Sequence, residues 1–523
     1  MVLSMRGGQI INVHSRHALD TTDEVGVVQE VADQSKVSQR WNITPVERDV
    51  YRIEHPQSGK CLIARDDNWS VVLGKDEDRP AQRWKLVAHA GGGSYLIENL
   101  ATNRVLDMPG WSTEPGTAVV QYESGGAVNQ QWLLTTLTDQ APEVATGPLW
   151  AWGQNGQGQL GNGQRVHSLT PVQVQGLTRV RQLAVGVYHS MALREDGTVR
   201  TWGNNGSGEL GDGTSAGATR CLPTGGPLLT GVQAIAPGQH HALALLEDRT
   251  LRAWGWNAYG QLGDRTKINQ TMPVKVSDLT GVKAIAAGTY HSIALLEDGR
   301  VRAWGHNGQG QLGNNTTADR LDPVPVLDHN NEALAGVQKI SAGERYNLAL
   351  REDGSVWAWG QGNWGQLGNG KNVDRACAVP VLDREGKRLD GVKDISAGPF
   401  HALALLQDDR KVLAWGHNEE GQLGNLTVTA NHSTAPVAVI DDGKPLAGVT
   451  ALCAAGLAEY EYSVALKDGE LLTWGKNNAL QLGNAAGGGA DPKPVVDKNG
   501  ERLRGIMMIA LDRASIHYLV ACG

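Results

Sequence analysis

One histidine recurs at a fixed position of a repeated segment, and histidine serves proteins both as a general base and as a metal ligand. The segments are of the type AxGxxHxxAL, and the position is occupied by His189, His241, His291, Tyr346, His401, Tyr462 and His517. Tyrosine replaces the histidine twice, and one histidine per repeat does not build a ligand cluster. We therefore interpret the position as a packing and hydrogen-bonding residue and expect no metal site.

Two further patterns suggest chemistry at first sight. Gly-rich decamers such as GHNGQGQLGN at 305–314 resemble phosphate loops, but none is followed by Lys-Ser or Lys-Thr at P-loop spacing. Paired acids such as Glu195-Asp196 and Glu352-Asp353 recur with the repeat, in segments that read as hairpin turns. HExxH does not occur, and the one GxSxG match, GTSAG at 213–217, directly follows a Gly-rich joint of the repeat. The sequence therefore predicts no catalytic residues, no cofactor and a non-enzymatic protein.

Charge and cysteine content narrow the class of protein further. The 523 residues carry a formal net charge of −8 without a basic run, so no nucleic-acid partner is expected. The five cysteines are scattered and contain no CxxC, which argues against a disulfide framework and against zinc. No apolar run reaches the roughly 18 residues of a membrane span, and the start lacks the features of a signal peptide. We expect a soluble protein, with its localisation left open.

A long repeat organises the second part of the chain. A Trp-Gly pair ends an apolar run at Trp152, Trp202, Trp254, Trp304, Trp359, Trp415 and Trp474, with spacings of 50, 52, 50, 55, 56 and 59 residues. Around each pair stand two alternating segments, an Asp-Gly type turn, and a Pro-Val segment typical of an edge strand. Four short strands per repeat predict one propeller blade, and repeats of this length favour a ring or an array.

The two ends of the repeat region are incomplete in complementary ways. The last segment, ALDRASIHYLVACG, has no Trp-Gly strand of its own, and PLWAWG at 148–153 is a Trp-Gly strand without preceding partners. We expect one blade to be built from both ends, which would close a ring of seven and remove exposed edge strands. The Gly-rich joint recurs with every Trp-Gly pair, so we interpret it as part of the blade architecture.

The motifs WGxNxxGQLG and AxGxxHxxAL resemble the regulator of chromosome condensation repeat family, over 148–523. The resemblance implies a seven-bladed β-propeller. The founding member is a guanine-nucleotide exchange factor that also binds nucleosomes, and other members are inhibitors or interaction platforms. Because this chain shows no basic N-terminal tail, the exchange activity is not expected here. A face that binds a protein partner is what the resemblance implies.

Four repeats carry an additional polar segment before the next repeat begins. These segments are VLDHNNEALAGV, VLDREGKRLDGV, VIDDGKPLAGV and VVDKNGERLRGI, each predicted to form a small hairpin on one face of the ring. The first three blades have shorter versions, so one rim of the ring is expected to be thicker. Decoration and a partner-binding rim are the two interpretations.

The first 137 residues contain a shorter repeat, Gln-x-Trp, which ends at Trp41, Trp84 and Trp132. Three copies at spacings of 43 and 48 residues, each with apolar alternation, a turn and a short strand, predict a threefold all-β unit. The pattern resembles the ricin-type lectin family and implies a β-trefoil. The disulfide that such trefoils often carry in each copy is absent, because Cys61 is the single cysteine of this part.

The resemblance also implies where sugar would bind. Sugar recognition needs a carboxylate or amide for vicinal hydroxyls and an aromatic face for the apolar side of the ring. In VLDMPGWSTEPGTAVVQYESGGAVNQQW the family pattern assigns Asp107 to the hydroxyls, Tyr122 to the platform and Asn129 to a further hydrogen bond. Trp111 is expected as a second wall, and Gln130 matches the structural glutamine of the family.

The other two copies fit this pattern less well. Copy one keeps Asp20 and Gln29 but offers Val31 in place of an aromatic, so it is predicted to be a weak site. Copy two has Ile63 where an aspartate is expected and is predicted not to bind, although Asp66 and Trp69 lie nearby.

These observations predict an all-β protein with a trefoil at 1–137, a linker at 138–147 and a seven-bladed propeller at 148–523. The trefoil is expected to bind a glycan or glycoprotein, and the propeller a protein partner, possible contexts being a bacterial host-directed or insecticidal toxin factor. The alternative is an intracellular regulatory or scaffold protein, of exchange-factor or inhibitor type, with a trefoil that binds no sugar. The lectin hypothesis requires Asp107 and Tyr122 to face one exposed site.

Overall fold

The computed structural model describes most of the chain and divides it into two compact units, Met1–Pro142 and Glu143–Gly523. The described residues are 5–12, 14–15, 17–21, 26–31, 37–47, 50–65, 69–88, 95–135, 149–223, 229–425, 430–456, 460–477, 482–483, 488–496, 500–503, 506–510 and 517–522. The predicted linker, 138–147, and Asp66 lie outside them. Among the described residues, no helix has the length and apolar character that crossing a membrane requires.

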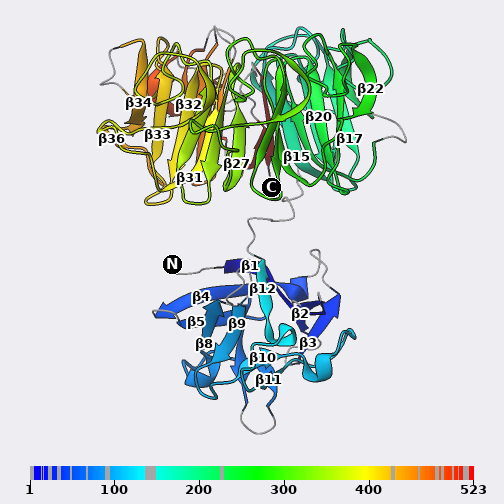
Figure 1. Ribbon diagram of the computed structural model, residues 1–523, viewed down its shortest axis with the longest axis vertical. Coiled ribbons are helices and arrows are strands. Elements are labelled where there is room, and N and C mark those ends of the chain that lie inside the picture. The colour runs from blue at the N-terminus through cyan, green and yellow to red at the C-terminus, as the bar shows by residue number, and fades with distance from the viewer. Residues whose placement is uncertain are drawn as a thin grey trace. The chain divides into compact units, whose positions relative to one another are not determined.

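The first unit contains β1–β12, which form one twelve-stranded sheet and are coloured blue to cyan in Figure 1. Its strands are β1 (Met5–Asn12), β2 (His17–Thr21), β3 (Val27–Val31), β4 (Trp41–Glu47), β5 (Val50–His55), β6 (Lys60–Ala64), β7 (Val71–Gly74), β8 (Trp84–Ala88), β9 (Tyr95–Asn99), β10 (Val105–Asp107), β11 (Val120–Tyr122) and β12 (Trp132–Thr135). Its 3-10 helices are η1 (Val37–Gln39), η2 (Pro80–Gln82), η3 (Pro109–Trp111) and η4 (Val128–Gln130).

The three tryptophans of Gln-x-Trp hold the same place in the three copies. Each is fully buried, and each donates its Nε1–H to the carbonyl of a leucine 22 or 26 residues earlier, at 2.9–3.0 Å. The pairs are Trp41–Leu19, Trp84–Leu62 and Trp132–Leu106. The large apolar rings fill one common core, so these residues explain the threefold fold and say nothing about a ligand.

The second unit is built from four-stranded antiparallel sheets, which stand side by side in Figure 1 from β15 to β34. Six are formed by consecutive strands: β15 (Val180–Val185), β16 (His189–Arg194), β17 (Val199–Gly203) and β18 (Ala218–Pro223); β19 (Val232–Pro237), β20 (His241–Leu246), β21 (Leu251–Gly255) and β22 (Gln270–Lys275); β23 (Val282–Ala287), β24 (His291–Leu296), β25 (Val301–Gly305) and β26 (Arg320–Pro325); β27 (Val337–Ala342), β28 (Tyr346–Arg351), β29 (Val356–Gly360) and β30 (Arg375–Pro380); β31 (Val392–Ala397), β32 (His401–Leu406), β33 (Val412–His417) and β34 (His432–Ala438); β37 (Val449–Ala455), β38 (Tyr462–Lys467), β39 (Glu470–Gly475) and β40 (Gly489–Pro494).

A seventh sheet combines strands from the two ends of the unit. It is formed by β13 (Leu149–Gly153) and β14 (Ser168–Gln173) with β41 (Ile506–Ala510) and β42 (His517–Cys522), in the order β14-β13-β42-β41. The register pairs Leu149 with Ala521 and Gly153 with His517. The expectation that one blade is built from both ends is confirmed.

The Gly-rich joint of one sheet packs against the tryptophan in the Trp-Gly pair of the following sheet. Trp304 Nε1 donates to the carbonyl of Gln261, and Trp359 Nε1 to that of Gln311, at 2.9 and 3.0 Å. Gly313 has φ +65°, and a Cβ there would lie 2.8 Å from Cδ1 of Trp359, so both its backbone and its close approach require glycine. The joint is therefore an element of blade packing, as the sequence predicts.

The same contact joins the last joint to the first tryptophan. A Cβ at Gly483 would lie 2.6 Å from Nε1 of Trp152, which repeats the geometry of the other joints. Trp152 also packs in one apolar cluster with Tyr462 and Val464 of β38. The sheet of β37–β40 thus packs on the sheet that contains β13, and the ring closes.

The four additional polar segments form short hairpins. Strands β35 (Ile440–Asp441) and β36 (Lys444–Pro445) pair with each other, and single bridges join Leu327 to Ala333, Leu382 to Arg388 and Val496 to Arg502. Each hairpin lies between the outer strand of one sheet and the inner strand of the next. The predicted hairpins are present at all four places.

Candidate functional site

Asp107 ends β10, and amide groups from the third Gln-x-Trp segment hold its carboxylate. Gln130 Nε2 donates to Asp107 Oδ2 at 2.7 Å, and Asn129 Nδ2 lies 3.3 Å from both carboxylate oxygens. Gln130 is itself fixed, because it also donates to the Glu123 carbonyl and accepts the Gly125 N–H. The structure therefore brings together the three polar residues predicted for this copy.

Tyr122 lies on the same face of the hairpin as Asp107. In the register of β10 and β11, Val105 pairs with Tyr122 and Asp107 with Val120. Directly paired residues, and residues two apart on one strand, point to the same face, so Asp107 and Tyr122 are diagonal neighbours. Tyr122 is 50% exposed and Asp107 is 5% exposed. A recessed acceptor and an open aromatic face thus stand side by side, as hydrogen bonding and stacking of a sugar ring require.

Trp111 stands in the turn that follows Asp107. It is 54% exposed, and its φ of +58° is unusual for a bulky residue. Its ring meets the His14 ring edge-on at 5.2 Å, and its carbonyl lies 3.2 Å from His14 Nε2. Its contacts are therefore with His14, and its role as a second wall stays a prediction.

Burial sets the ionisation of Asp107. Desolvation raises the pKa of this carboxyl, and the hydrogen bond from Gln130 offsets that effect only in part. The net pKa is above that of an ordinary aspartate. A sugar that donates hydroxyls to the ionised carboxylate would therefore be released on acidification sooner than from an exposed aspartate.

Copy one holds an equivalent carboxylate without an aromatic neighbour. Asp20 is 3% exposed and accepts a hydrogen bond from Gln39 Nε2 at 3.0 Å, just as Asp107 accepts one from Gln130. The register pairs Asp20 with Val28 and Ala18 with Glu30, so Glu30 occupies the place of Tyr122.

Gln29 serves copy three rather than the side of Asp20. It is fully buried, and its Nε2 donates to the carbonyls of Ser112 and Glu114 at 3.1 and 2.9 Å. It therefore supports the loop that follows Trp111. Its predicted part in a sugar site of copy one has no contact in this structure to support it.

Copy two lacks both elements of the site but contributes to copy three. Ile63 pairs with Val72 in the place of the aspartate, and Gly74 has the place of Tyr122. Trp69, however, lies against Tyr122 with ring centroids 4.7 Å apart. The sequence offers no signal for this contact between residues 53 positions apart, beyond the presence of an unassigned tryptophan.

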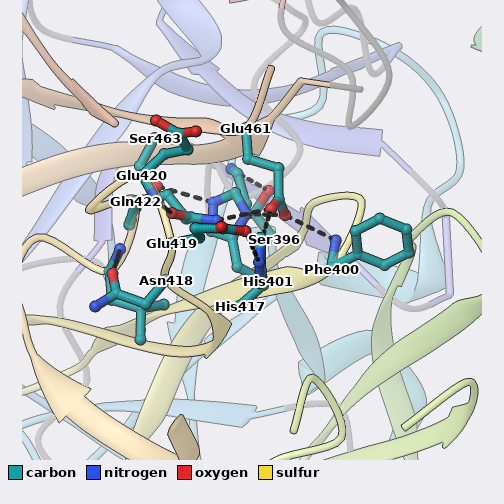
Figure 2. A network of polar contacts seen from close by, with 12 residues as sticks. Ser396, Phe400, His401, His417, Asn418, Glu419, Glu420, Gln422, Glu461 and Ser463 are labelled. Carbon is teal, nitrogen blue, oxygen red and sulfur yellow. Dashed lines mark hydrogen bonds and ion pairs between the residues drawn. The ribbon is translucent and has the colours of Figure 1, made fainter. Parts of the chain in front are cut away.

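A buried carboxylate lies at the centre of a polar cluster of the propeller (Figure 2). Glu461 is 1% exposed and receives the Phe400 N–H at 3.1 Å and Gln422 Nε2 at 2.7 Å. His401 Nδ1 lies 3.3 Å from one carboxylate oxygen, and His417 Nδ1 contacts the other.

Glu461 and His417 shift each other's ionisation. Burial alone would raise the pKa of Glu461, but the hydrogen bonds from His401 and His417 outweigh it and hold the pKa below its usual range. Burial alone would lower the pKa of His417, but Glu461 and Glu419 hold it above its usual range. The cluster is thus a buried ion pair with its hydrogen bonds largely satisfied.

Ser463, His401 and Glu461 stand in the order of a catalytic triad. His401 Nε2 lies 2.9 Å from Ser463 Oγ. Ser463 and His401 are fully buried, however, and the serine hydroxyl donates to the Gln422 carbonyl at 2.8 Å, whereas a nucleophile must donate to the histidine. His241 and Ser292 form the same contact at 3.0 Å in another blade. The arrangement is therefore a structural link.

These links explain the recurring histidine. His241 contacts Ser292, His291 contacts Asn347 at 2.8 Å, and each partner lies on the next sheet. One sheet has Ala402 in the place of this polar partner. On the sheet before it the recurring position is Tyr346, whose hydroxyl donates to the His401 carbonyl at 2.6 Å. The position joins neighbouring blades, in agreement with its interpretation as a packing and hydrogen-bonding residue.

His189 breaks this rule. The next sheet offers Ala242, and neither ring nitrogen of His189 has a hydrogen-bond partner among the described residues. The ring is fully buried, and desolvation lowers its pKa to about 4.

We expect His189→Tyr to stabilise the propeller by about 1 kcal/mol near neutral pH, because a tyrosine above Ala242 can reproduce the hydrogen bond of Tyr346. Wild-type His189 binds a proton more tightly when unfolded, so stability falls as pH drops from its usual pKa to about 4, by up to about 3 kcal/mol. The variant loses this dependence. Urea unfolding between pH 4 and 7 measures both effects.

His241→Tyr is the matched control, because His241 already contacts Ser292 on the next sheet, so a tyrosine would replace that hydrogen bond rather than supply a missing one. It should destabilise the propeller. If both variants behave alike, the pairing rule is wrong.

A row of half-buried aromatic rings lies at the blade ends that carry the joints. Trp256 and Tyr290 lie 4.9 Å apart, and Tyr259 and His306 4.5 Å apart, by ring centroid. The chain of contacts, named the aromatic row, comprises Tyr188, His240, Trp256, Tyr259, Tyr290 and His306. Half-exposed tryptophan and tyrosine are the residue types that most often anchor protein partners.

Comparison with known families agrees with this architecture. Residues 140–387 match the RCC1-like domain, and residues 392–422 match the regulator of chromosome condensation (RCC1) repeat. Residues 4–70 and 80–167 match the ricin-type beta-trefoil lectin domain-like family.

Individual relatives match a large part of this chain. The ultraviolet-B receptor UVR8 of Arabidopsis thaliana is 33% identical over 282 residues, which is 53% of this chain and 62% of the receptor. RCC1 domain-containing protein RUG3, mitochondrial, of the same plant is 29% identical over 397 residues, covering 70% of this chain and 86% of that protein. Yeast RCC1 (Prp20) bound to Kap60 has the same fold, with a TM-score of 0.58 at 22% identity over 72% of this chain and 89% of that chain. By its family matches and its fold, this chain joins a ricin-type β-trefoil lectin-like domain to a propeller of regulator of chromosome condensation repeats.

Proposed function

We propose that this protein is a non-enzymatic carbohydrate-binding and protein-interaction protein whose glycan site is the third copy of the trefoil. The observation that carries the proposal is the pairing of Asp107, recessed and held by Asn129 and Gln130, with the half-exposed ring of Tyr122 on the same hairpin face. The carboxylate accepts vicinal hydroxyls, Asn129 adds a hydrogen bond, and Tyr122 stacks on the apolar side of the sugar. Trp111 completes the site as a second wall.

Copy one contributes at most a weaker site in this proposal. Asp20 has the same amide support as Asp107, but the place of Tyr122 is taken by Glu30, which offers no stacking face. A single strong site binds a monovalent sugar weakly, so the biological ligand is expected to be a dense glycan surface or a multivalent glycoprotein.

The propeller presents the partner-binding face in this proposal, and the aromatic row is its centre. Rigid aromatic rings such as Trp256 and Tyr290 bury large areas at a small entropic cost when a partner covers them. Yeast RCC1, which shares the fold, is bound to the protein Kap60 in its structure. The relatives named above come from a plant and from yeast and give no support to the expected bacterial or toxin context.

The alternative is a regulatory or scaffold protein whose trefoil binds no sugar. The similarity of the propeller to a plant photoreceptor and to a yeast protein bound to Kap60 favours it. The two hypotheses make opposite predictions for the trefoil, so one binding experiment separates them.

Asp107→Ala is expected to weaken glycan binding by at least about 100-fold, because a hydrogen bond to a charged group contributes about 1.5–3 kcal/mol and the carboxylate makes more than one. The intact protein and the variant are compared on a glycan array and then by calorimetry with the best-bound glycan. Wild-type binding should also weaken on acidification as Asp107, whose pKa burial raises, becomes protonated.

Asp20→Ala is the control, because Asp20 has the same amide contact without an aromatic neighbour. It should change the affinity less than twofold. A wild-type protein that binds no glycan at high density would contradict the proposal and favour the scaffold alternative.

A further inference from the structure

Trp69 comes from copy two, yet its backbone is attached to the hairpin that carries the third-copy site. Ser70 forms an antiparallel bridge with Val120, and the Gln121 N–H donates to the Trp69 carbonyl at 2.8 Å. Gln121 precedes Tyr122 directly. The position of Trp69 beside Tyr122 is therefore set by strand pairing rather than by a loose loop.

The backbone at Trp69 is in a conformation that favours glycine. Its φ is +65°, in the left-handed region, which bulky residues rarely adopt. Outliers of this kind persist where surrounding contacts over-determine them, and they gather at ligand sites. Its side-chain contacts among the described residues include the Tyr122 ring at 4.7 Å, with an interplanar angle of 52°, and the Arg104 guanidinium 4.5 Å over the indole. The indole thus contacts both a cation and the predicted sugar platform.

Trp69 has no part in a sugar site of its own copy. Among the described residues, copy two has Ile63 in the place of Asp107 and Gly74 in the place of Tyr122, so these two places hold neither a carboxylate nor an aromatic platform. The indole is partly exposed, and the neighbouring ring is the 50% exposed Tyr122. Copy two therefore lends its aromatic residue to the site of copy three.

We propose that Trp69, held by Arg104, forms a second stacking subsite next to Tyr122, so that the third-copy site recognises a disaccharide or a longer glycan. One sugar lies on Tyr122 with its hydroxyls on Asp107, and the adjoining sugar lies against Trp69. The inference rests on the proposed function of the trefoil and names its ligand class more narrowly: a glycan of at least two sugar units, with apolar faces presented in succession.

The experiment uses the full chain and two probes, the best-bound disaccharide of the glycan array and the methyl glycoside of its terminal sugar. Calorimetry compares wild type with Trp69→Ala, Trp69→Phe and Asp107→Ala. Trp69→Ala should weaken the disaccharide about 10-fold, as the loss of one aromatic stacking contact would, and change the monosaccharide less than twofold. Trp69→Phe should recover part of the loss, and Asp107→Ala should weaken both probes.

Several outcomes would overturn the inference without touching the proposed function. Equal losses for both probes in Trp69→Ala would mean that Trp69 only supports the Tyr122 ring. Unchanged affinities would mean that it has no part in the site. Equal affinity of wild type for both probes would exclude a second subsite. Absence of binding by wild type would remove the proposed function and the inference together. Circular dichroism of Trp69→Ala shows whether the trefoil stays folded, and Trp69→Phe keeps the test valid if it does not.

Discussion

Replacing Glu461 by glutamine is expected to lower the free energy of unfolding of the propeller by about 3 kcal/mol. The carboxylate accepts hydrogen bonds from four directions, and an amide cannot accept all of them, since its nitrogen is itself a donor. Breaking a buried ion pair by removing one partner typically costs about 3–5 kcal/mol, because the other charge stays buried without compensation. Here that group is His417, which is 7% exposed.

The pH dependence of stability shows whether the loss in Glu461→Gln comes from breaking the ion pair between Glu461 and His417. Glu461 has a lowered pKa in the folded state, so its contribution is present above its usual pKa and is lost as pH falls through the folded value. His417 has a raised pKa, so its contribution is present below its usual pKa and is lost as pH rises through the folded value. Wild-type stability from this pair is therefore greatest between the two usual values, and Glu461→Gln should flatten both limbs. Urea unfolding followed by tryptophan fluorescence measures both limbs, from below the folded pKa of Glu461 to above the folded pKa of His417.

Glu209→Gln is the matched control for that variant. Glu209 is a second buried glutamate among the described residues, but it stands at the joint position that is Gln159, Gln261 or Gln311 in other blades. Its Oε2 accepts the Ser207 N–H just as Gln261 Oε1 accepts the Tyr259 N–H. A glutamine therefore fits this position, and Glu209→Gln should lower the free energy of unfolding by less than about 1 kcal/mol. If Glu461→Gln is equally mild, the cluster is not a stabilising ion pair.

The propeller was predictable because its signals are local and repeated. Each Trp-Gly pair, Asp-Gly turn and apolar alternation specifies a short strand by itself, and the closed ring is the arrangement that buries all of them. The shared blade followed from two incomplete ends of the same repeat, PLWAWG and the segment of His517.

The third-copy site was predictable only through the resemblance to a lectin family. Family spacing identified Asp107, Asn129 and Gln130, and the structure brings them together. Family spacing also assigned Gln29 to the sugar site of copy one, and this assignment failed because the hairpins differ in length between copies. Asp20 pairs with a residue 8 positions later, whereas Asp107 pairs with one 13 positions later. A shift of one residue along a strand turns a side chain to the opposite face, and Gln29 is turned into the core.

The contacts between distant segments were out of reach. His401, His417 and Glu461 come from separate segments of the chain, and the repeat that marks His401 as a packing residue gives no sign of its contact with Glu461. Trp69 and Tyr122 belong to different copies of the trefoil and meet only because Ser70 pairs with Val120. Such pairings depend on tertiary register, which a single sequence does not encode in any short window.

The ring has one seam at which its closure depends on hydrogen bonds between distant parts of the chain. At this seam β13 pairs with β42 over Leu149–Ala521 to Gly153–His517, and β41 pairs only with β42. Every other sheet is continuous in sequence. The seam is therefore the place where removing one terminal segment takes two strands from a sheet and leaves β13 as an open edge.

Deletion of residues 506–523 is expected to destabilise the propeller by more than about 5 kcal/mol, which is comparable with the whole stability of many domains. The truncated chain should lose its cooperative unfolding transition and associate through the exposed edge of β13. Urea unfolding and size-exclusion chromatography measure the two effects.

The control is a circular permutant of the propeller that joins residue 522 to residue 149 by a short linker and opens the chain between β18 and β19. Because Leu149 pairs with Ala521, the joined ends are adjacent, and all strands are retained. This permutant should unfold cooperatively. A truncated chain that stays as stable as the permutant would show that the ring does not depend on its seam.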